Sequence, residues 1–157
     1  DVSKATNMAS MFHNATSFNQ PLNEWDTSRV TSMWSMFWGA TSFNQPLSGW
    51  VTSSFQDISL MFYGATSFNQ PLSTWDTSNV KNMRSAFYEA ASFNQPLGNW
   101  DVSSCENFSY MFNRCNSFNQ PLGDWNMSNA KDMKYMLFRA INFNQNYQFP
   151  PMFLSFL

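Results

Sequence analysis

The chain has 157 residues, a length that suits one domain with its own hydrophobic core. Charged residues make up 11% and aromatic residues 18%, which excludes a charged disordered tail because such tails lack the apolar surface to collapse. The net charge of −2 argues against a nucleic-acid partner, since phosphate binding requires clustered Lys and Arg. The longest apolar stretch, around residues 149–157, contains two prolines and is too short to cross a bilayer.

The sequence repeats every 25 residues without an insertion, and residues 142–147 form a degraded sixth copy. A fixed period of this length indicates equivalent coils stacked in register, so that side chains one period apart become neighbours. We expect a single repeat domain over residues 1–147, followed by a C-terminal tail or cap over residues 148–157. Because residues 1–3 continue a repeat whose Trp is missing, further coils or a partner are expected to precede them. The repeats are phased at Phe18, Phe43, Phe68, Phe93, Phe118 and Phe143.

Within each repeat, apolar residues spaced by three and four positions predict one face of a helix of about three turns. In the second repeat these residues are Val30, Met33, Met36, Phe37 and Ala40. A serine before the stripe, such as Ser28, is suited to cap the helix, and an acidic residue such as Asp26 complements its dipole. Asn14, Gly39 and Gly64 follow the stripe and suit a left-handed helix end, whereas the equivalent Glu89, Arg114 and Arg139 do not.

A proline column predicts the entry of a short parallel strand over residues 22–25 and its equivalents, because proline cannot donate to a β-ladder. The predicted fold is therefore an α/β solenoid. We expect a leucine-rich-repeat-like, right-handed stack of about six 25-residue coils, each with a short parallel strand and a short helix. The prolines of this column are Pro21, Pro46, Pro71, Pro96 and Pro121.

Two amide columns, which include Asn44 and Gln45, run through all six repeats. They form either a polar binding stripe or a structural ladder of amides that bond one another and the backbone, and the second interpretation is preferred. Cys105 and Cys115 occupy predicted core positions at opposite ends of one expected helix. We expect buried free thiols there, in preference to a disulfide, because the helix would hold them too far apart.

The consensus S-F-N-Q-P-L-x-x-W-D-x-S-x-V-x-x-M-x-x-M-F-x-x-A resembles the repeats of BspA-like leucine-rich-repeat surface proteins, in particular a branch of unknown function. The similarity covers residues 1 to about 147. The resemblance implies a leucine-rich-repeat-like fold, an extracellular or cell-surface location, and a role in adhesion or protein contact. This family has no agreed catalytic residues that could be transferred to the chain.

Candidate chemistry is sparse in this sequence. His13 is the only histidine, so no catalytic triad and no histidine metal site can be assembled, and we expect neither an enzyme nor a cofactor. A calcium stripe along the Asp26 column is disfavoured because one carboxylate per coil supplies too few ligands. Possible N-glycosylation sites occur at Asn14, Asn107 and Asn126.

One column follows the buried phenylalanines and is mainly aromatic, which makes it the candidate ligand surface. Exposed rings there can stack on sugars or anchor a protein, with Trp34 expected one helical turn before Trp38. The alternative is that the rings lean against neighbouring coils and only stabilise the stack. The candidate contact residues are Trp34, Trp38, Tyr63, Tyr88 and Phe138.

The leading functional hypothesis is a non-catalytic surface or secreted module that contacts protein or carbohydrate, without nucleic acid and without membrane insertion by this segment. The alternative is a structural subunit of a larger extracellular or particle assembly, joined through the ends or faces of the stack. Ice binding is a third hypothesis, but it needs a regular threonine array, and the Thr16, Thr41 and Thr66 column gives way to other residues.

Overall fold

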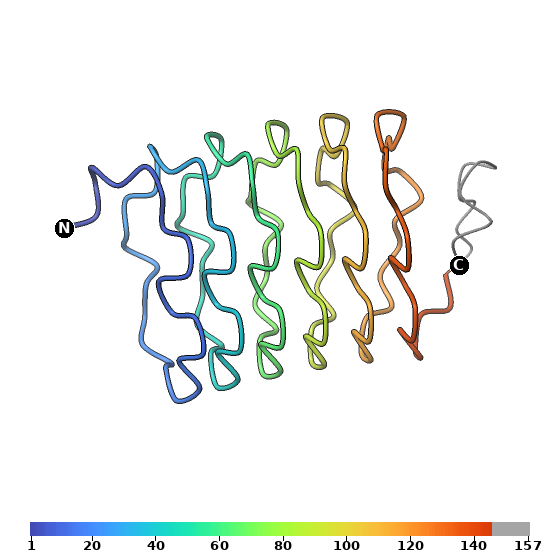
Figure 1. Cartoon of the computed structure of the whole chain (residues 1–157), viewed down its shortest axis with the longest axis horizontal. Helices are drawn as coiled ribbons and strands as arrows, with labels where there is room; N and C mark the ends of the chain where they lie inside the picture. Colours follow the sequence, from blue (N-terminus) through green and yellow to red (C-terminus); the bar gives the residue numbers. More distant parts are fainter. Residues whose placement is uncertain (146–157) are drawn as a thin grey trace.

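The computed structural model describes residues 1–145, which form a stack of similar coils lying side by side in chain order (Figure 1). The last residues of the predicted repeat domain and the predicted tail or cap over 148–157 lie outside the described residues. Equivalent residues of successive coils are neighbours, as shown by hydrogen bonds between residues 25 positions apart, such as Asn44 N to Asn19 Oδ1 at 2.9 Å.

The predicted α/β fold with a strand and a helix in each coil is wrong. The described residues contain neither a helix nor an extended strand, and each coil is a series of turns joined by extended linkers. Among the described residues, the only β-structure between consecutive coils is a set of isolated parallel β-bridges, which follow one column of the repeat. The bridges are Asn7 to Ser32, Ser32 to Asp57, Asp57 to Asn82, Asn82 to Asn107, and Asn107 to Asp132.

Backbone N–H groups explain why turns replace the expected helix. Met36 N donates to Met33 O within the coil at 3.1 Å, whereas Phe37 N donates to Met61 O of the next coil at 2.8 Å. This alternation continues along the segment, because Ser35 N donates to Ser59 O of the next coil at 3.0 Å. About half of the backbone N–H groups that would donate within a helix therefore donate to the next coil and hold the stack together.

Left-handed residues prevent a helix in the same segment. Ser35 has a φ of 58° and Gly39 a φ of 65°, and each is the third residue of a four-residue turn. A left-handed third residue is a feature of type II turns and is incompatible with an α-helix. Both columns are left-handed in all six coils: Ser10, Ser35, Leu60, Ser85, Tyr110 and Tyr135 in one, and Asn14, Gly39, Gly64, Glu89, Arg114 and Arg139 in the other.

The predicted strand over residues 22–25 is also wrong. Trp25 N donates to Leu22 O at 3.0 Å, so this segment is a turn. The parallel bridges lie instead at Ser32 and its equivalents, inside the stretch expected to be helical.

The acidic residue expected to face a helix dipole has a different structural role. Asp26 Oδ1 accepts from Ser28 N at 3.0 Å and so closes a turn of the kind that Asp and Asn side chains favour. Hydrogen bonds from the Ser28 side chain and backbone lower the pKa of Asp26. The same contact recurs between Ser103 N and Asp101 Oδ1 at 2.9 Å.

Aromatic ladders fill the core between the two sides of each coil. Phe37 stacks on Phe43 of its own coil at 4.0 Å and lies 5.6 Å from the equivalent rings Phe12 and Phe62. A parallel ladder runs through the tryptophans, where Trp50 Nε1 donates to Leu22 O of the preceding coil at 2.9 Å. The indole N–H is therefore satisfied although the ring is buried.

The structural interpretation of the amide columns is confirmed. Gln45 Nε2 donates to Asn19 Oδ1 at 3.1 Å, and Gln95 Nε2 donates to Asn69 Oδ1 at 3.0 Å. Within residues 1–145, every fully buried side-chain nitrogen or oxygen has a hydrogen-bond partner.

The two cysteines are buried free thiols, as predicted. The expected reason for this is wrong, because no helix separates them. Cys115 Sγ donates to Ala90 O of the preceding coil at 3.1 Å, and Cys105 Sγ lies 3.6 Å from Lys81 O.

Candidate binding surface

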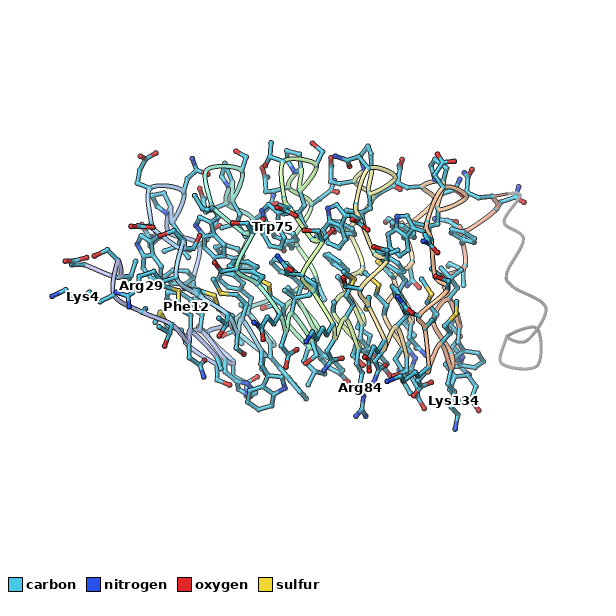
Figure 2. All side chains as sticks on the ribbon, turned by 90° about the horizontal axis from the view of Figure 1, so that it is seen from above. Lys4, Phe12, Arg29, Trp75, Arg84 and Lys134 are labelled. Carbon is cyan, nitrogen blue, oxygen red and sulfur yellow. The ribbon has the colours of Figure 1, made fainter. Side chains whose placement is uncertain are left out.

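One edge of the stack is formed by the longest turn segment of every coil, and we refer to it as the turn edge. In the second coil, for example, this segment buries Ser35, Met36 and Phe37 and exposes Trp34 to solvent. Arg84 and Lys134 project from this edge, away from the side on which Trp75 lies (Figure 2). The turn edge comprises residues 9–14, 34–39, 59–64, 84–89, 109–114 and 134–139.

The candidate aromatic column forms a continuous stack in the middle of the turn edge. The centroids of Trp38 and Tyr63 are 4.3 Å apart, and those of Tyr63 and Tyr88 are 4.4 Å apart with an interplanar angle of 3°. His13 continues the column at 5.2 Å from Trp38. The rings therefore cover one another's faces, and the middle of this stack offers ring edges to a ligand.

The ring stack changes the pKa of one of its tyrosines. Burial raises the pKa of Tyr63, and the adjacent Tyr88 and Glu89 raise it further. Tyr63 is therefore an un-ionised hydrogen-bond donor and acceptor at neutral pH.

Trp34 lies apart from this stack although the sequence suggested a joint platform. Its side chain is 43% exposed, and it makes no ring contact with Trp38 or with any other aromatic residue among residues 1–145. The expected alignment depended on a helical turn, and the left-handed Ser35 between the two residues replaces that turn.

The aromatic column is interrupted in the fifth coil by Asn113, which is only 3% exposed. Asn113 Nδ2 donates to Tyr135 O at 3.4 Å, so its short side chain is held inside the stack and does not project from the turn edge. Beyond it the column resumes at Phe138, which is 43% exposed. The interruption coincides with a depression of about 310 Å³ lined by Tyr88, Tyr110, Asn113, Arg114, Tyr135 and Phe138.

Two tyrosines of this depression are absent from the set of contact residues that the sequence predicts. Tyr110 and Tyr135 lie 5.3 Å apart at an angle of 47°, and Tyr135 meets Phe138 edge to face at 5.4 Å. Both occupy a left-handed column that holds serine or leucine in the other four coils. The appearance of aromatic residues in that column is the signal that could have identified them.

The sequons lie at three different places. Asn14 is exposed on the turn edge, and Asn126 is exposed on another turn, where its Oδ1 accepts from Ser128 N at 3.2 Å. Asn107 is half-buried in the bridge column, and its Oδ1 accepts from both Ser109 N and Ser109 Oγ. Of the three, Asn107 has the least accessible side chain.

Over the described part of the chain, His, Cys, Asp and Glu side chains form no group of three or more that could hold a metal ion. Likewise, residues 1–145 contain no helix of the length and apolar character that a membrane span requires.

The register of the coils, the ladders and the bridges together define a repeat protein in which each 25-residue unit contacts mainly its neighbours. The chain belongs to the family described as Mycoplasma protein of unknown function, DUF285, which matches residues 1–83 and 47–149. No curated protein and no solved structure matches the chain.

Proposed function

We propose that this chain is a non-catalytic module of a surface or secreted protein, and that it contacts protein or carbohydrate through the turn edge. The observation that carries the proposal is the concentration of partly exposed rings on that edge. Trp34, Tyr135 and Phe138 are each more than one third exposed, although aromatic residues elsewhere in the stack are mostly buried. Rings at a protein surface supply binding energy through their large apolar area.

The surface location is part of the same proposal. It is supported by the resemblance of the repeat consensus to BspA-like surface proteins. A stack with repeated outward-facing columns also suits an extended contact surface, since each coil adds equivalent positions along one edge.

An array of immobilised glycans and extracellular-matrix proteins tests the proposal. The purified chain is compared with the Tyr88→Ala/Phe138→Ala double variant and with a control double variant, Thr74→Ala/Asn99→Ala. The control residues are exposed and bond carbonyl groups of the preceding coil away from the turn edge. We expect the control to keep the binding pattern of the wild type and the aromatic variant to lose it.

Equal binding by all three proteins would show that the turn edge is not the contact surface. No binding by the folded wild type to any arrayed glycan or protein would contradict the proposed contact function itself. Circular dichroism of each variant, recorded before the array measurement, verifies that the compared chains are folded.

A further inference from the structure

The gap in the aromatic column leaves one face of Tyr88 without a stacked ring among residues 1–145. Tyr63 covers one face of Tyr88 at 4.4 Å, and the opposite face is directed toward the fifth coil, where Asn113 supplies no ring. Phe138 is the next ring of the column, two coils beyond Tyr88. The depression of about 310 Å³ lies between them, and we refer to it as the ring slot.

The width of the ring slot suits a single six-membered ring. Parallel-bridged backbones lie about 4.8 Å apart, so residues two coils apart are separated by about 9.6 Å. A guest ring in carbon contact with a ring on each side needs about 3.5 to 4.0 Å per side, or roughly 7 to 8 Å in total. One ring therefore fits between Tyr88 and Phe138, whereas the closed stack from Trp38 to Tyr88 has no such space.

The lining of the ring slot combines apolar faces with hydrogen-bonding groups. Tyr88, Tyr110 and Tyr135 contribute hydroxyl groups, and Arg114 contributes an exposed guanidinium. A pyranose has apolar C–H faces and a rim of hydroxyl groups, so it can pack against rings and pair with these polar groups at once. An aromatic side chain of a partner protein would fill the slot but would leave several polar groups without partners, which lowers affinity.

Charge around the ring slot indicates that the ligand is an anion. The last three segments of the turn edge carry Arg84, Arg114, Lys134, Arg139 and the single acidic residue Glu89, a net charge of +3 in a chain whose total is −2. The Arg139 guanidinium lies 5.3 Å from the centre of the Phe138 ring, and Lys134 Nζ lies 5.1 Å from that of Tyr135. Half of the eight basic residues of the chain thus lie on these three segments of the turn edge.

Arg114 is held at the rim by an ion pair with Glu89, with 2.7 Å between Nη1 and Oε1. The pair fixes the guanidinium beside the slot, and Arg84, Lys134 and Arg139 form no ion pair within the described residues. These three cations are therefore available to an acidic group of a bound ligand.

We infer that the ring slot binds a pyranose ring that carries an acidic group, with the ring between Tyr88 and Phe138 and the acidic group toward the cationic side chains. The inference rests on the proposed contact function and specifies its ligand class. A single-stranded nucleic acid also combines flat rings with negative charge. It is disfavoured because the cationic patch spans only three coils, whereas a polyanionic strand requires positive charge along its path.

Isothermal titration calorimetry with a galacturonic acid tetramer tests the inference, with its fully methyl-esterified form as the matched neutral ligand. We expect the acidic tetramer to bind more tightly than the ester, with an affinity that falls as salt rises. Tyr88→Ala and Phe138→Ala should each weaken binding roughly tenfold or more. Thr74→Ala/Asn99→Ala, which changes exposed residues away from the turn edge, should leave binding unchanged.

Asn113→Tyr is the most specific variant, because it restores a ring to the interrupted column and fills the slot. We expect it to abolish binding of the acidic tetramer while the chain keeps its fold by circular dichroism. Should this substitution unfold the chain, Arg84→Gln/Lys134→Gln provides the second test, with reduced affinity and a weaker dependence on salt as the expected result.

Four results would overturn the inference: no binding of the acidic tetramer, equal affinity for the acid and its ester, unchanged binding by folded Asn113→Tyr, or tighter binding of a thymidine decamer than of the acidic tetramer. In each of these cases the proposed function still stands if the array shows binding that depends on the aromatic residues of the turn edge. Failure of the inference is therefore distinguishable from failure of the proposed function.

Discussion

Each asparagine of the amide ladder connects its own coil to the next one. Asn69 Oδ1 accepts from Asn94 N at 2.9 Å and from Gln95 Nε2 at 3.0 Å, while Asn69 N donates to Asn44 Oδ1 at 2.9 Å. One side-chain oxygen thus satisfies two donors of the following coil. The recurrence of asparagine in every repeat follows from this geometry, because the carboxamide has the length and the acceptor that the contact requires.

Asn69→Ala should lower the free energy of unfolding by about 1 to 3 kcal/mol, because two part-buried donors of the next coil lose their acceptor. Urea denaturation followed by tryptophan fluorescence measures the change. Asn99→Ala is the matched control: its exposed amide makes a single bond to Ser73 O, so a change within about 0.5 kcal/mol is expected. Equal effects of the two substitutions would contradict the structural role of the ladder.

The buried cysteines predict a specific pH dependence. Burial raises the pKa of the Cys105 thiol to about 12 and that of Cys115 above its ordinary value as well. In the unfolded chain these thiols ionise near pH 8.5. Above that pH the unfolded state loses protons that the folded state retains, so the thiols' contribution to stability is complete below pH 8.5 and declines as pH rises toward 12.

Cys105→Val/Cys115→Ala places in the fifth coil the residues found at the equivalent positions Val30 and Ala40. We expect the wild type to lose more stability than this double variant between pH 8 and about 10.5, as measured by urea denaturation. In the native wild type at pH 8, both thiols should resist a disulfide reagent and should react fully in denaturant. Rapid labelling of the folded chain would contradict the observed burial.

At the scale of the element, the sequence predicts the period but not the local backbone. The apolar spacing of three and four positions is shared by a helix and by consecutive turns, since the first and fourth residues of such turns, Met33 and Met36, both face the core. Periodicity cannot separate the two because both bury the same positions. The turns differ from a helix at left-handed residues such as Glu89 and Arg114. Glu and Arg side chains have no preference for the left-handed conformation, so the sequence does not reveal it.

The candidate surface, like the fold, was predictable in its repeat columns but not in its local geometry. Its columns follow from the repeat, because the 25-residue period alone places Trp38, Tyr63 and Tyr88 in one line. The ring slot was not predictable, because it depends on Asn113 turning inward and on Tyr110 and Tyr135 standing beside it. Those orientations arise from the turn geometry, and a helix would have pointed the same residues elsewhere.

Three glycines distinguish two causes of strain in the turns: a left-handed backbone and a steric clash of an added Cβ atom. Gly39 and Gly64 share a φ of 65°, but only at Gly39 would an added Cβ meet a close neighbour, Asn14 Oδ1. Gly123 has no left-handed φ and nothing within 4 Å of an added Cβ. Gly64→Ala should therefore cost about 1 to 2 kcal/mol from conformation alone, and Gly39→Ala should cost more. Gly123→Ala should be neutral or stabilising by up to about 1 kcal/mol.

Thermal or urea denaturation of the three alanine variants gives this order directly. An equal cost at Gly39 and Gly64 would mean that Asn14 moves aside freely, so that conformation is the whole effect. A cost at Gly123 as large as that at Gly64 would contradict the importance of the left-handed conformation.

At the scale of the whole molecule, coils are held together by the same contacts repeated along one direction. Trp75, for example, stacks on Trp50 and Trp100 at 6.2 Å each, and its Nε1 donates to Leu47 O of the preceding coil at 3.2 Å. Stability in such a stack is approximately the sum of coil and interface contributions. A residue with partners on both sides should therefore contribute more than its equivalent with a partner on one side.

Phe62 and Phe12 test this expectation because they occupy the same column. Phe62 is buried between Phe37 at 5.6 Å and Phe87 at 5.4 Å, whereas Phe12 is half-buried and has only Phe37 as a ladder neighbour. Phe62→Ala should lower the free energy of unfolding by about 3 to 5 kcal/mol, and Phe12→Ala by roughly half as much. Urea denaturation of the chain of residues 1–157 measures both values. An equal loss at the two positions would mean that the interface between coils adds little to the burial of a ring, since the two variants differ chiefly in the number of coils that each ring contacts.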